Sequence, residues 1–428
     1  MIAPSDWDDF RGYVNPWVAM RAELGGEPSK VVRAAGSTLW DESNGPVADF
    51  TSGWGTQPLG HRDPVVAAAL RAFLDTDEPA FHPAGPSPLT GRLARVLCER
   101  TGGERVIFAS GGGEAVDAAL KLARAATGRK RIVALSGAYH GCTYGAVAMM
   151  PPGPFSDGFA PHLPGVESLP FDDEVALDAL GDDVAAIVVE PLQVEAGVRV
   201  LSPACVAALG RAADRTGALL IADEIQTGLG RCGGLLATAS WTRRPDVVVL
   251  GKGLGGGFLP ISAVVCRADT WERAYGSWLT CEAHASTWAG APMACVAALS
   301  TLDQLDERCF SAARRAGERL RSGLVAAIGT HPMVAEVRGD GLLIGVALHA
   351  ADHPWLGFEA MGVPELADRP SIGFVTAWKL GRAGFYAAPC GHDWTVVRAM
   401  PPLNVDDGTI DAFVAAFAEA LAWLGERT

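Results

Sequence analysis

The sequence predicts an α/β protein built on a mostly parallel β-sheet, and three observations lead to this fold class. Short apolar runs, most of them rich in β-branched residues, recur through the middle of the chain. Their continuous apolarity is typical of strands that are buried on both faces. Segments with helical spacing of apolar residues lie between several of these runs. Alternating strands and helices of this kind form parallel sheets.

Six runs are the predicted strands of this sheet. In chain order they are RVIFAS (105–110), RIVALS (131–136), AAIVVE (185–190), ALLIADE (218–224), DVVVLGK (246–252) and ISAVVC (261–266). Helices are predicted at 114–127, where Gly128 follows as a stop signal, and at 205–217. Function in such sheets gathers at the carboxyl ends of the strands. Those ends carry Ser110, Glu190, Asp223 and Lys252.

The last third of the chain changes character and predicts a second, smaller α+β domain. Helical patterns at 291–328 and 407–425 flank short strands at 341–348 and 394–400. We therefore expect a large domain over residues 61–305 and a small domain over 306–428. Residues 1–60 contain strand and turn signals, and we expect them to pack with the small domain. The segment 350–370 is aperiodic and contains Pro and Gly, which is typical of an irregular insertion.

The composition is that of an ordinary globular enzyme. The 428 residues are 49% hydrophobic and 20% charged, and the net charge is −14. An acidic balance of this size argues against nucleic acid or an anionic membrane as a partner. The longest uncharged window, from Ala283 to Leu302, is rich in small residues, so we interpret it as protein interior and not as a membrane span.

The cysteines and the N-terminal residues bear on the compartment. Nine cysteines are scattered without any CxxC pair, which is typical of a reducing compartment and argues against a disulfide framework or a zinc site. The first residues, MIAPSDWDDF, are acidic and lack the basic and apolar regions of a secretion signal. We therefore expect a cytoplasmic protein without a metal site.

Lys252 is the first candidate catalytic residue. It ends the apolar run 246–252 and is followed by glycines in GKGLGGGFLP, and it is one of five lysines in a chain with 30 arginines. A lysine at a strand end, partly dried by apolar neighbours, can have a lowered pKa and act as an amine nucleophile, whereas arginine stays protonated. A surface lysine in a glycine-rich turn is the other interpretation of this stretch alone.

Asp223 and Glu224 end another apolar run, 218–224. A buried carboxylate there needs a cationic partner, and a protonated pyridine nitrogen would serve. A helix cap or a structural ion pair is the plainer alternative. The amide and glycines of the following IQTGLGR (225–231) favour the functional interpretation, because simple capping requires neither.

The stretch SGGGE (110–114) places glycines between a strand and a helix. Free N–H groups at such a helix start bind phosphate. A nicotinamide-dinucleotide loop is the alternative, but the spacing differs from GxGxxG and no matching acid ends a second strand. Tyr139 follows the next strand, where its ring could stack on a planar cofactor or pack in the core.

Together these stretches resemble the class III pyridoxal-phosphate (PLP) aminotransferases of fold type I, the group of ornithine, 4-aminobutyrate and ω-amino acid aminotransferases. The resemblance covers roughly residues 50–405. It rests on SGGGEAVDAALKLAR (110–124), YHG (139–141), VVEPLQVEAGV (188–198), ADEIQTGLGR (222–231), GKGLGGGFLPISA (251–263), HASTWAGAPMAC (284–295), VRGDGLLIGV (337–346) and VRAMPPLNV (397–405). The ordered set is far more specific than any single motif.

The resemblance implies a cofactor-binding role for each matching residue. Lys252 would hold PLP as a Schiff base and later move a proton, and Asp223 would keep the pyridine nitrogen protonated so that the ring acts as an electron sink. Gln226 would contact the phenolic oxygen, and Glu190 would support the ring near Asp223. The remaining implied cofactor-binding residues are Tyr139, stacked on the ring, His140 of the same motif, Gly112 and Gly113 on the phosphate, and Thr287 on the phosphate held by a neighbouring subunit.

The resemblance also implies substrate-binding residues. Arg398 matches the arginine that grips a substrate carboxylate as a bidentate fork, and Glu195 matches the glutamate that pairs with it and swings aside. Trp54, in TSGWGTQPLGHRDP (51–64), would line the substrate pocket. A structural ion pair for Arg398 and core packing for Trp54 are the alternatives. This chain departs from the family pattern at Gly113, at Ala291 and at Val194, and Val194 could restrict Glu195.

The activity implied is a ping-pong aminotransferase in a homodimer with shared active sites. It would move an amino group from an ω-amino acid or a simple amine to a 2-oxo acid such as 2-oxoglutarate or pyruvate. The alternative on the same scaffold is a PLP-dependent epimerase, aminomutase, lyase or decarboxylase, because pocket groups set the fate of the carbanion. A cofactor-free or dinucleotide-binding protein with the same kind of sheet is a further alternative.

Overall fold

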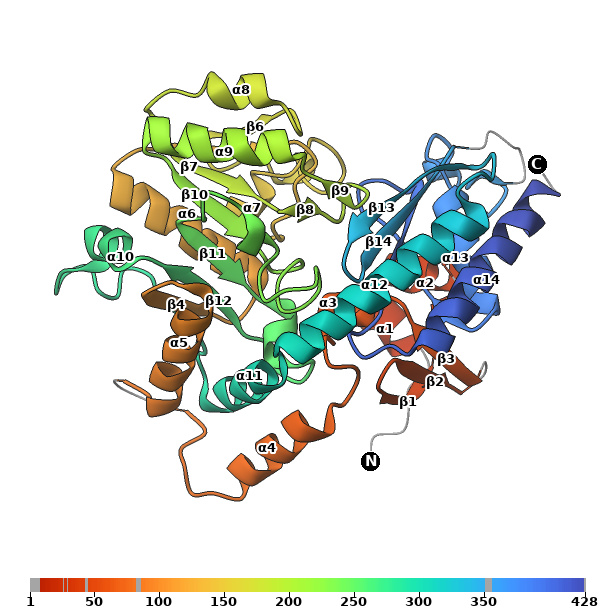
Figure 1. Ribbon diagram of the computed structural model, residues 1–428, viewed down its shortest axis with the longest axis horizontal. Helices are drawn as coiled ribbons and strands as arrows, with labels where there is room; N and C mark the ends of the chain where they lie inside the picture. The colour runs from red at the N-terminus through yellow and green to blue at the C-terminus, as the bar shows by residue number, and fades with distance from the viewer. Residues whose placement is uncertain are drawn as a thin grey trace. The chain divides into compact units, whose positions relative to one another are not determined.

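The structure is a computed structural model that describes residues 8–25, 27–28, 30–42, 45–81, 86–350 and 356–426 (Figure 1). By its internal contacts the chain divides into two units. Unit 1 contains residues 1–63, 195–199 and 311–428, and unit 2 contains residues 64–194 and 200–310. Residues 1–7 of the N-terminal stretch, and 351–355 of the predicted insertion 350–370, lie outside the described residues.

A seven-stranded sheet forms the centre of unit 2. Its strands are β4 (Arg105–Ala109), β5 (Arg131–Leu135), β6 (Val166–Leu169), β7 (Val184–Val189), β10 (Leu219–Asp223), β11 (Val247–Leu250) and β12 (Ser262–Cys266), in the order β4-β12-β11-β10-β7-β5-β6. Strand β12 pairs antiparallel with both neighbours, and the other pairs are parallel. This confirms the predicted α/β class and adds the edge strand β6, which the sequence pattern did not identify.

Helices cover both faces of this sheet. Alternate residues of β5 pack into two different clusters: Ile132 and Ala134 lie with α6 (Gly112–Thr127), and Val133 and Leu135 lie with α9 (Pro203–Thr216). All four side chains are at most 1% exposed. This double burial explains why the strands are continuous apolar runs. Unit 2 also contains α4 (Pro64–Leu74), α5 (Pro88–Thr101), α7 (Tyr144–Val147), α8 (Glu174–Asp178), α10 (Ala268–Tyr275) and α11 (Pro292–Gln304).

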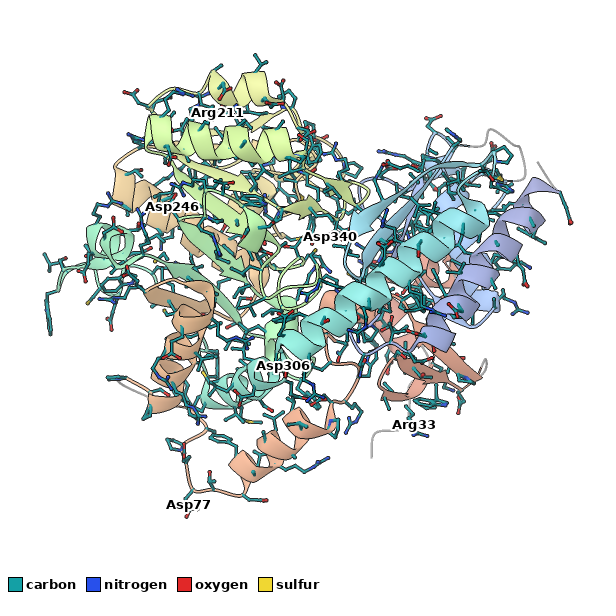
Figure 2. The ribbon with its side chains drawn as sticks, viewed as in Figure 1. Arg33, Asp77, Arg211, Asp246, Asp306 and Asp340 are labelled. Carbon is teal, nitrogen blue, oxygen red and sulfur yellow. The ribbon has the colours of Figure 1, made fainter. Side chains whose placement is uncertain are left out.

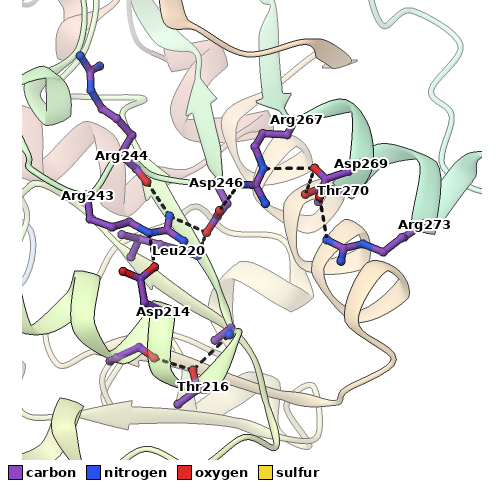
Figure 3. A network of polar contacts seen from close by, with 12 residues as sticks. Asp214, Thr216, Leu220, Arg243, Arg244, Asp246, Arg267, Asp269, Thr270 and Arg273 are labelled. Carbon is purple, nitrogen blue, oxygen red and sulfur yellow. Dashed lines mark hydrogen bonds and ion pairs between the residues drawn. The ribbon is translucent and has the colours of Figure 1, made fainter.

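Charged side chains fix the amino ends of β10 and β11 (Figure 3). The buried Asp246 carboxylate accepts the N–H of Leu220 at 2.9 Å and pairs with Arg243 at 2.8 Å and with Arg267 at 3.7 Å. Arg243 also pairs with Asp214 of α9 at 3.2 Å. A buried carboxylate with several donors is well satisfied, so this network anchors the sheet at the edge opposite to the carboxyl ends.

Other charged residues lie at the surface, among them Arg211, which is labelled in Figure 2. Arg211 of α9 is about half exposed and pairs with Asp178 of α8 at 2.9 Å. Exposed ion pairs of this kind contribute little to stability, because water screens both charges. Burial of the apolar strands accounts for the stability of unit 2 far more than such pairs do.

Unit 1 contains two small sheets. The first, in the order β1-β2-β3-β15, consists of β1 (Val31–Ala35), β2 (Thr38–Asp41), β3 (Gly45–Asp49) and β15 (Phe385–Tyr386). The second, in the order β13-β14-β17-β16, consists of β13 (Val334–Asp340), β14 (Leu343–Leu348), β16 (Ala388–Pro389) and β17 (Val396–Ala399). Its helices are α1 (Asp8–Tyr13), α2 (Pro16–Leu24), α3 (Ser52–Gly55), most of α12 (Glu307–Ile328), α13 (Ile372–Arg382) and α14 (Asp407–Gly425).

Aromatic side chains form the core of unit 1. The rings of Phe50 and Phe413 stack with centroids 3.9 Å apart, and Phe385 meets both of them edge-on. Phe413 also contacts Phe417 one turn later on α14. Because Phe50 directly follows β3, this core fixes the place where the chain leaves the first sheet.

Two sequence interpretations need correction. The helical pattern at 291–328 forms two helices, because Leu305 leaves the helical conformation with ψ 75° between α11 and α12. The window 283–302 was expected to lie in the interior, but Ala283, Ala285 and Thr287 are exposed. The reason is local: residues 283–290 form turns, and burial becomes regular only where α11 begins.

Helix α14 is long and apolar enough, by length and composition alone, to cross a membrane. Its buried side chains recur every three or four positions, at Ile410, Phe413, Phe417, Leu421 and Leu424. This spacing forms one apolar face, as in a helix that packs on a protein core. The core helix of a soluble protein passes the same test of composition.

Candidate active site

Four predicted residues follow four neighbouring parallel strands of unit 2. Lys252 comes after β11, Asp223 ends β10, Glu190 comes after β7 and Tyr139 comes after β5. The sheet order β11-β10-β7-β5 places these strands side by side. The carboxyl ends of parallel strands meet at one edge, so the strand order brings these residues to the same edge of the sheet.

Asp223 is bonded to His140 in the interior. The Oδ2 atom of Asp223 lies 2.7 Å from Nδ1 of His140, and Oδ1 accepts the N–H of Ile225 at 3.0 Å. Burial disfavours the charged form of His140, but the hydrogen bond and charge of Asp223 outweigh it and, with the charge of Glu190, raise the pKa of His140. The sequence analysis assigned both residues to cofactor binding but did not predict that they contact each other.

Lys252 lies in a backbone conformation that lysine rarely adopts, with φ 41°. The preceding Gly251 has no room for a side chain, because a Cβ there would lie 2.7 Å from Oγ of Ser262. The Nζ atom of Lys252 donates to Oε1 of Gln226. Strained conformations of this kind cluster at functional sites, and this one brings the only lysine of the motif against the predicted amide.

Gln226 belongs to a loop that a second buried carboxylate organises. The oxygens of Glu224 accept the hydroxyl of Thr227 at 2.6 Å, the N–H of Ala237 at 3.0 Å, and both the N–H and the hydroxyl of Thr238 at 2.8 Å. Burial raises the pKa of Glu224, while these hydrogen bonds act in the opposite direction. Glu224 therefore has a structural role, in contrast to its neighbour Asp223.

The start of α6 forms a narrow cradle. A Cβ on Gly112 would lie 3.0 Å from Cδ1 of Ile225, and a Cβ on Gly141 would lie 2.7 Å from Cα of Gly113. The helix start and the YHG turn therefore approach each other closely only because these residues lack side chains. The first N–H groups of a 16-residue helix have no partner within the helix and attract an anion.

A hydroxyl that the sequence analysis did not identify lies in this cradle. Oγ1 of Thr143 donates to the carbonyl of Gly113 at 3.1 Å, and it lies 3.3 Å from where a Cβ on Gly113 would be. Gly113 was noted as a departure from the family pattern because the commoner residue there is an alanine or one with a hydroxyl. Thr143 supplies one at the same place, and its position just after YHG was the available signal.

Tyr139, Glu190 and Thr287 occupy different settings. The N–H of Tyr139 donates to Oε1 of Glu190 at 3.0 Å, so Glu190 contacts the backbone of the residue predicted to stack on the ring. Thr287 is exposed in the turns between α10 and α11. Its expected contact is with the cofactor of a second subunit, which a single chain does not contain.

Unit 1 contains the predicted carboxylate-binding residues. Nη1 of Arg398, on β17, lies 2.5 Å from Oε1 of Glu195, and Oε2 of Glu195 accepts the N–H of Gly391 at 2.7 Å. The guanidinium carbon of Arg398 lies 4.6 Å from the ring centroid of Trp54. Arg398 is 1% exposed. The predicted Glu195–Arg398 pair is therefore formed, although Val194 precedes it, and Trp54 contacts it.

These residues fit the predicted cofactor. A buried carboxylate hydrogen-bonded to His140 would provide a negative charge for a protonated ring nitrogen, Lys252 would provide an amine, and the glycine cradle would provide N–H groups for a phosphate. The combination of an amine, an acid and an anion cradle at the carboxyl edge of a parallel sheet defines a protein of the PLP-dependent transferase class.

Comparison with known proteins identifies the family. Residues 22–421 match the family model "Aminotransferase class-III", so the chain belongs to this family. The fold and the enzyme class predicted from the sequence are confirmed. The chain is 33% identical, over 96% of its length, to the aminotransferase PigE of Serratia sp. (strain ATCC 39006), and it spans about half of that protein, 52%.

Two solved structures agree with this assignment. The ornithine aminotransferase of Toxoplasma gondii ME49 superposes with a TM-score of 0.82 at 30% identity, covering 93% of this chain and 91% of that one. An amine transaminase from an uncultivated Pseudomonas species, described in a PLP-bound form, superposes with a TM-score of 0.80 at 30% identity, covering 92% and 94%. The second structure accords with the cofactor predicted here.

Proposed function

We propose that this chain is a PLP-dependent aminotransferase that transfers the amino group of an ω-amino acid or simple amine to a 2-oxo acid. The observation that carries the proposal is the placement of Lys252, Gln226 and Asp223 at the carboxyl ends of adjacent strands, with Lys252 bonded to Gln226 and Asp223 bonded to His140. The membership in the class-III family supports it.

Each residue has a defined task in this proposal. Asp223 would hold a proton on the ring nitrogen, and His140 orients the Asp223 carboxylate through its hydrogen bond. Bound PLP supplies an electron-withdrawing ring that stabilises negative charge at the substrate carbon. Lys252 binds the cofactor through Nζ and then holds and moves a proton on the same atom. Gln226 orients the phenolic side of the ring, and Gly112 and Gly113 bind the phosphate.

The substrate class follows from unit 1 and from the relatives. When Glu195 turns away, Arg398 can bind a substrate carboxylate. When Glu195 stays paired with Arg398, the charge of the guanidinium is neutralised. Such a pair suits a donor with an amine distant from its carboxylate, or a plain amine, and then a 2-oxo acid acceptor. The solved relatives include enzymes named for ornithine and for amines.

A donor panel tests the reaction type. Protein loaded with PLP is mixed with 4-aminobutyrate, ornithine or butylamine in the absence of an acceptor, and the visible spectrum is followed. We propose that an amine donor alone converts the cofactor to its amine form, and that 2-oxoglutarate or pyruvate restores it. Turnover that leaves the cofactor spectrum unchanged would instead indicate an epimerase, aminomutase, lyase or decarboxylase.

Replacing Arg398 with alanine is expected to impair carboxylated donors selectively. Loss of a hydrogen bond to a charged group corresponds to about a 10- to 150-fold decrease in kcat/KM, so 4-aminobutyrate should lose this factor. Butylamine, which differs by lacking the carboxylate, should change far less. Arg398→Lys is the matched control, because it keeps the charge but removes the fork. Equal losses for both amines would contradict the recognition role.

We also propose that the chain acts as a homodimer in which Thr287 completes the site of the second copy. The supporting observation is the apolar exposure of the segment before α11, where Trp278 is 93% and Leu279 is 92% exposed. Large exposed apolar side chains that lie together mark contact surfaces. Thr287 belongs to the same segment of turns.

The dimer is tested with Trp278→Glu. We expect this variant to sediment as a monomer and to retain PLP more weakly, because the second copy no longer supplies Thr287. Val175→Glu is the matched control, since Val175 on α8 is also exposed and should leave the sedimentation unchanged. A dimeric Trp278→Glu variant, or a monomeric wild-type protein, would argue against this interface.

The remaining expectations concern location and other partners. We propose a cytoplasmic location, which the nine free cysteines support, since such thiols persist in reducing compartments. Burial raises the pKa of Cys205 to about 12, which disfavours the thiolate form at neutral pH. The net charge of −14 supports the proposal that neither nucleic acid nor a membrane is a partner.

A further inference from the structure

Asp49, at the end of β3, is a fully buried carboxylate that accepts five polar contacts. Its Oδ1 atom accepts the N–H of Thr51 at 2.7 Å, the hydroxyl of Thr51 at 2.7 Å and the N–H of Ser52 at 3.0 Å. Its Oδ2 atom accepts the N–H of Gly53 at 3.0 Å and lies 2.8 Å from Nε2 of His61. Three successive backbone N–H groups thus converge on one carboxylate.

Two of the residues that Asp49 binds, Ser52 and Gly53, begin a left-handed turn. The φ angles are 52° at Ser52, 53° at Gly53, 60° at Trp54 and 87° at Gly55. Residues with a Cβ adopt this region only at a cost in free energy, so it persists where the surroundings enforce it. The hydrogen bonds to Asp49 enforce it here, because in this conformation the N–H groups point toward the carboxylate.

His61 is fixed independently of this turn. Its backbone forms a bridge with Gly36: the N–H of His61 donates to Gly36 at 2.7 Å, and the N–H of Gly36 donates to His61 at 3.1 Å. A Cβ on Gly60 would lie 2.8 Å from Cα of Gly36, so the two segments can approach only as glycines. The imidazole is therefore held against Asp49 by the turn between β1 and β2.

This arrangement determines the position of Trp54. The ring centroid of Trp54 lies 4.6 Å from the guanidinium carbon of Arg398. The N–H of Met400, two residues after Arg398, donates at 2.7 Å to the carbonyl of Phe50, which precedes the turn. The Nε atom of Arg398 is buried and has no hydrogen-bond partner within the described part of the chain. Trp54 covers one face of the guanidinium, and Glu195 takes Nη1.

We propose that Asp49 and His61 are positioning residues that hold Trp54 against Arg398, and that through Trp54 they set the affinity of the site for a substrate carboxylate. This inference rests on the proposed role of Arg398 in carboxylate binding. A cation over an aromatic face is stabilised and oriented, and both effects depend on the turn that presents the ring. Asp49 and His61 touch neither substrate nor cofactor in this account.

The test compares Asp49→Asn, His61→Ala and Trp54→Ala in PLP-loaded enzyme. The readouts are the dissociation constant of succinate, followed by the change in the cofactor's visible band, and the kcat and KM values for 4-aminobutyrate and butylamine. Each variant should weaken succinate binding by roughly 2- to 30-fold, the range expected for loss of a cation–π contact. KM for 4-aminobutyrate should rise by a similar factor, with a much smaller change for butylamine.

The combination of variants separates positioning from general damage. Asp49→Asn in the Trp54→Ala background should cause no further loss, because both act through the same ring. His61→Gln should restore the behaviour of the wild type, since its amide can donate from nearly the place of Nε2. If Asp49→Asn fails to fold, His61→Ala in the Trp54→Ala background tests the same non-additivity.

Two results would overturn the inference while leaving the proposed function intact. One is an additive effect of His61→Ala or Asp49→Asn in the Trp54→Ala background. The other is an equal loss for 4-aminobutyrate and butylamine. If Arg398→Ala itself leaves succinate binding unchanged, then the proposed role of Arg398 is wrong, and this inference falls with it.

Discussion

Replacing Lys252 with alanine is expected to abolish amino-group transfer and the covalent retention of PLP. Lys252 follows β11 at the carboxyl edge of the sheet, and its Nζ atom donates a hydrogen bond to Oε1 of Gln226. Proton transfer by a positioned side chain alone contributes about 10²- to 10⁴-fold to a rate. Loss of the nucleophile adds to this, so turnover in the variant should fall by at least the upper part of that range.

Two measurements check the expected result for Lys252. Purified wild-type protein with PLP should absorb in the visible range, and reduction with borohydride should leave the cofactor attached to the peptide that contains Lys252. Lys252→Arg is the matched control, because it keeps the positive charge but cannot deprotonate to act as a nucleophile. Borohydride attachment at one of the other four lysines, with full turnover in Lys252→Ala, would refute the assignment.

Much of unit 2 was predictable because its strands are buried on both faces. Continuous apolarity in β5 and β10 follows directly from helices on both sides, and parallel strands then fix which edge carries Asp223 and Lys252. The direction of β12 was not predictable, since an antiparallel strand in this position has the same apolar pattern. The edge strand β6 is only partly buried and carries Glu167, so its pattern is weak.

The residue pairs of the site were harder to predict than the residues themselves. Sequence order says that His140 and Asp223 follow different strands, but not that Nδ1 and Oδ2 meet at 2.7 Å. The Glu195–Arg398 pair was found through family resemblance and not through spacing, as the two residues are 203 positions apart. Asp49 was missed because a single acid before a turn is an ordinary cap, and its five contacts depend on the left-handed turn and on His61.

Replacing Asp223 with asparagine is expected to have the second largest effect, on both catalysis and pH dependence. The variant keeps the shape of the side chain but removes the negative charge that would hold a proton on the ring nitrogen. Without that proton the ring withdraws electrons less strongly, so turnover should fall by about 10²- to 10³-fold, the loss typical of removing one electrostatic stabiliser of the transition state. Asp223→Glu keeps the charge and is the control. Steady-state turnover with a saturating donor and acceptor measures the loss.

The same variant predicts a change in the pH dependence of stability. Burial opposes the charge on His140, and Asp223 outweighs this and raises the pKa of His140 above the ordinary value of about 6.5. A raised pKa in the folded state contributes stability that is fully present below the unfolded value and is lost as the pH rises through the folded value. Asp223→Asn removes this contribution. Only the charge of Glu190 then opposes the lowering of the His140 pKa by burial.

The free energy of unfolding should therefore differ more between wild type and Asp223→Asn at about pH 6 than at about pH 9. The measurement uses cofactor-free protein, because bound PLP would stabilise the folded state through its own affinity. His140→Asn, which removes the titrating ring, should show a pH profile in which a further Asp223→Asn substitution has little pH-dependent effect. A difference that stays constant across this range would mean that Asp223 does not control the charge of His140.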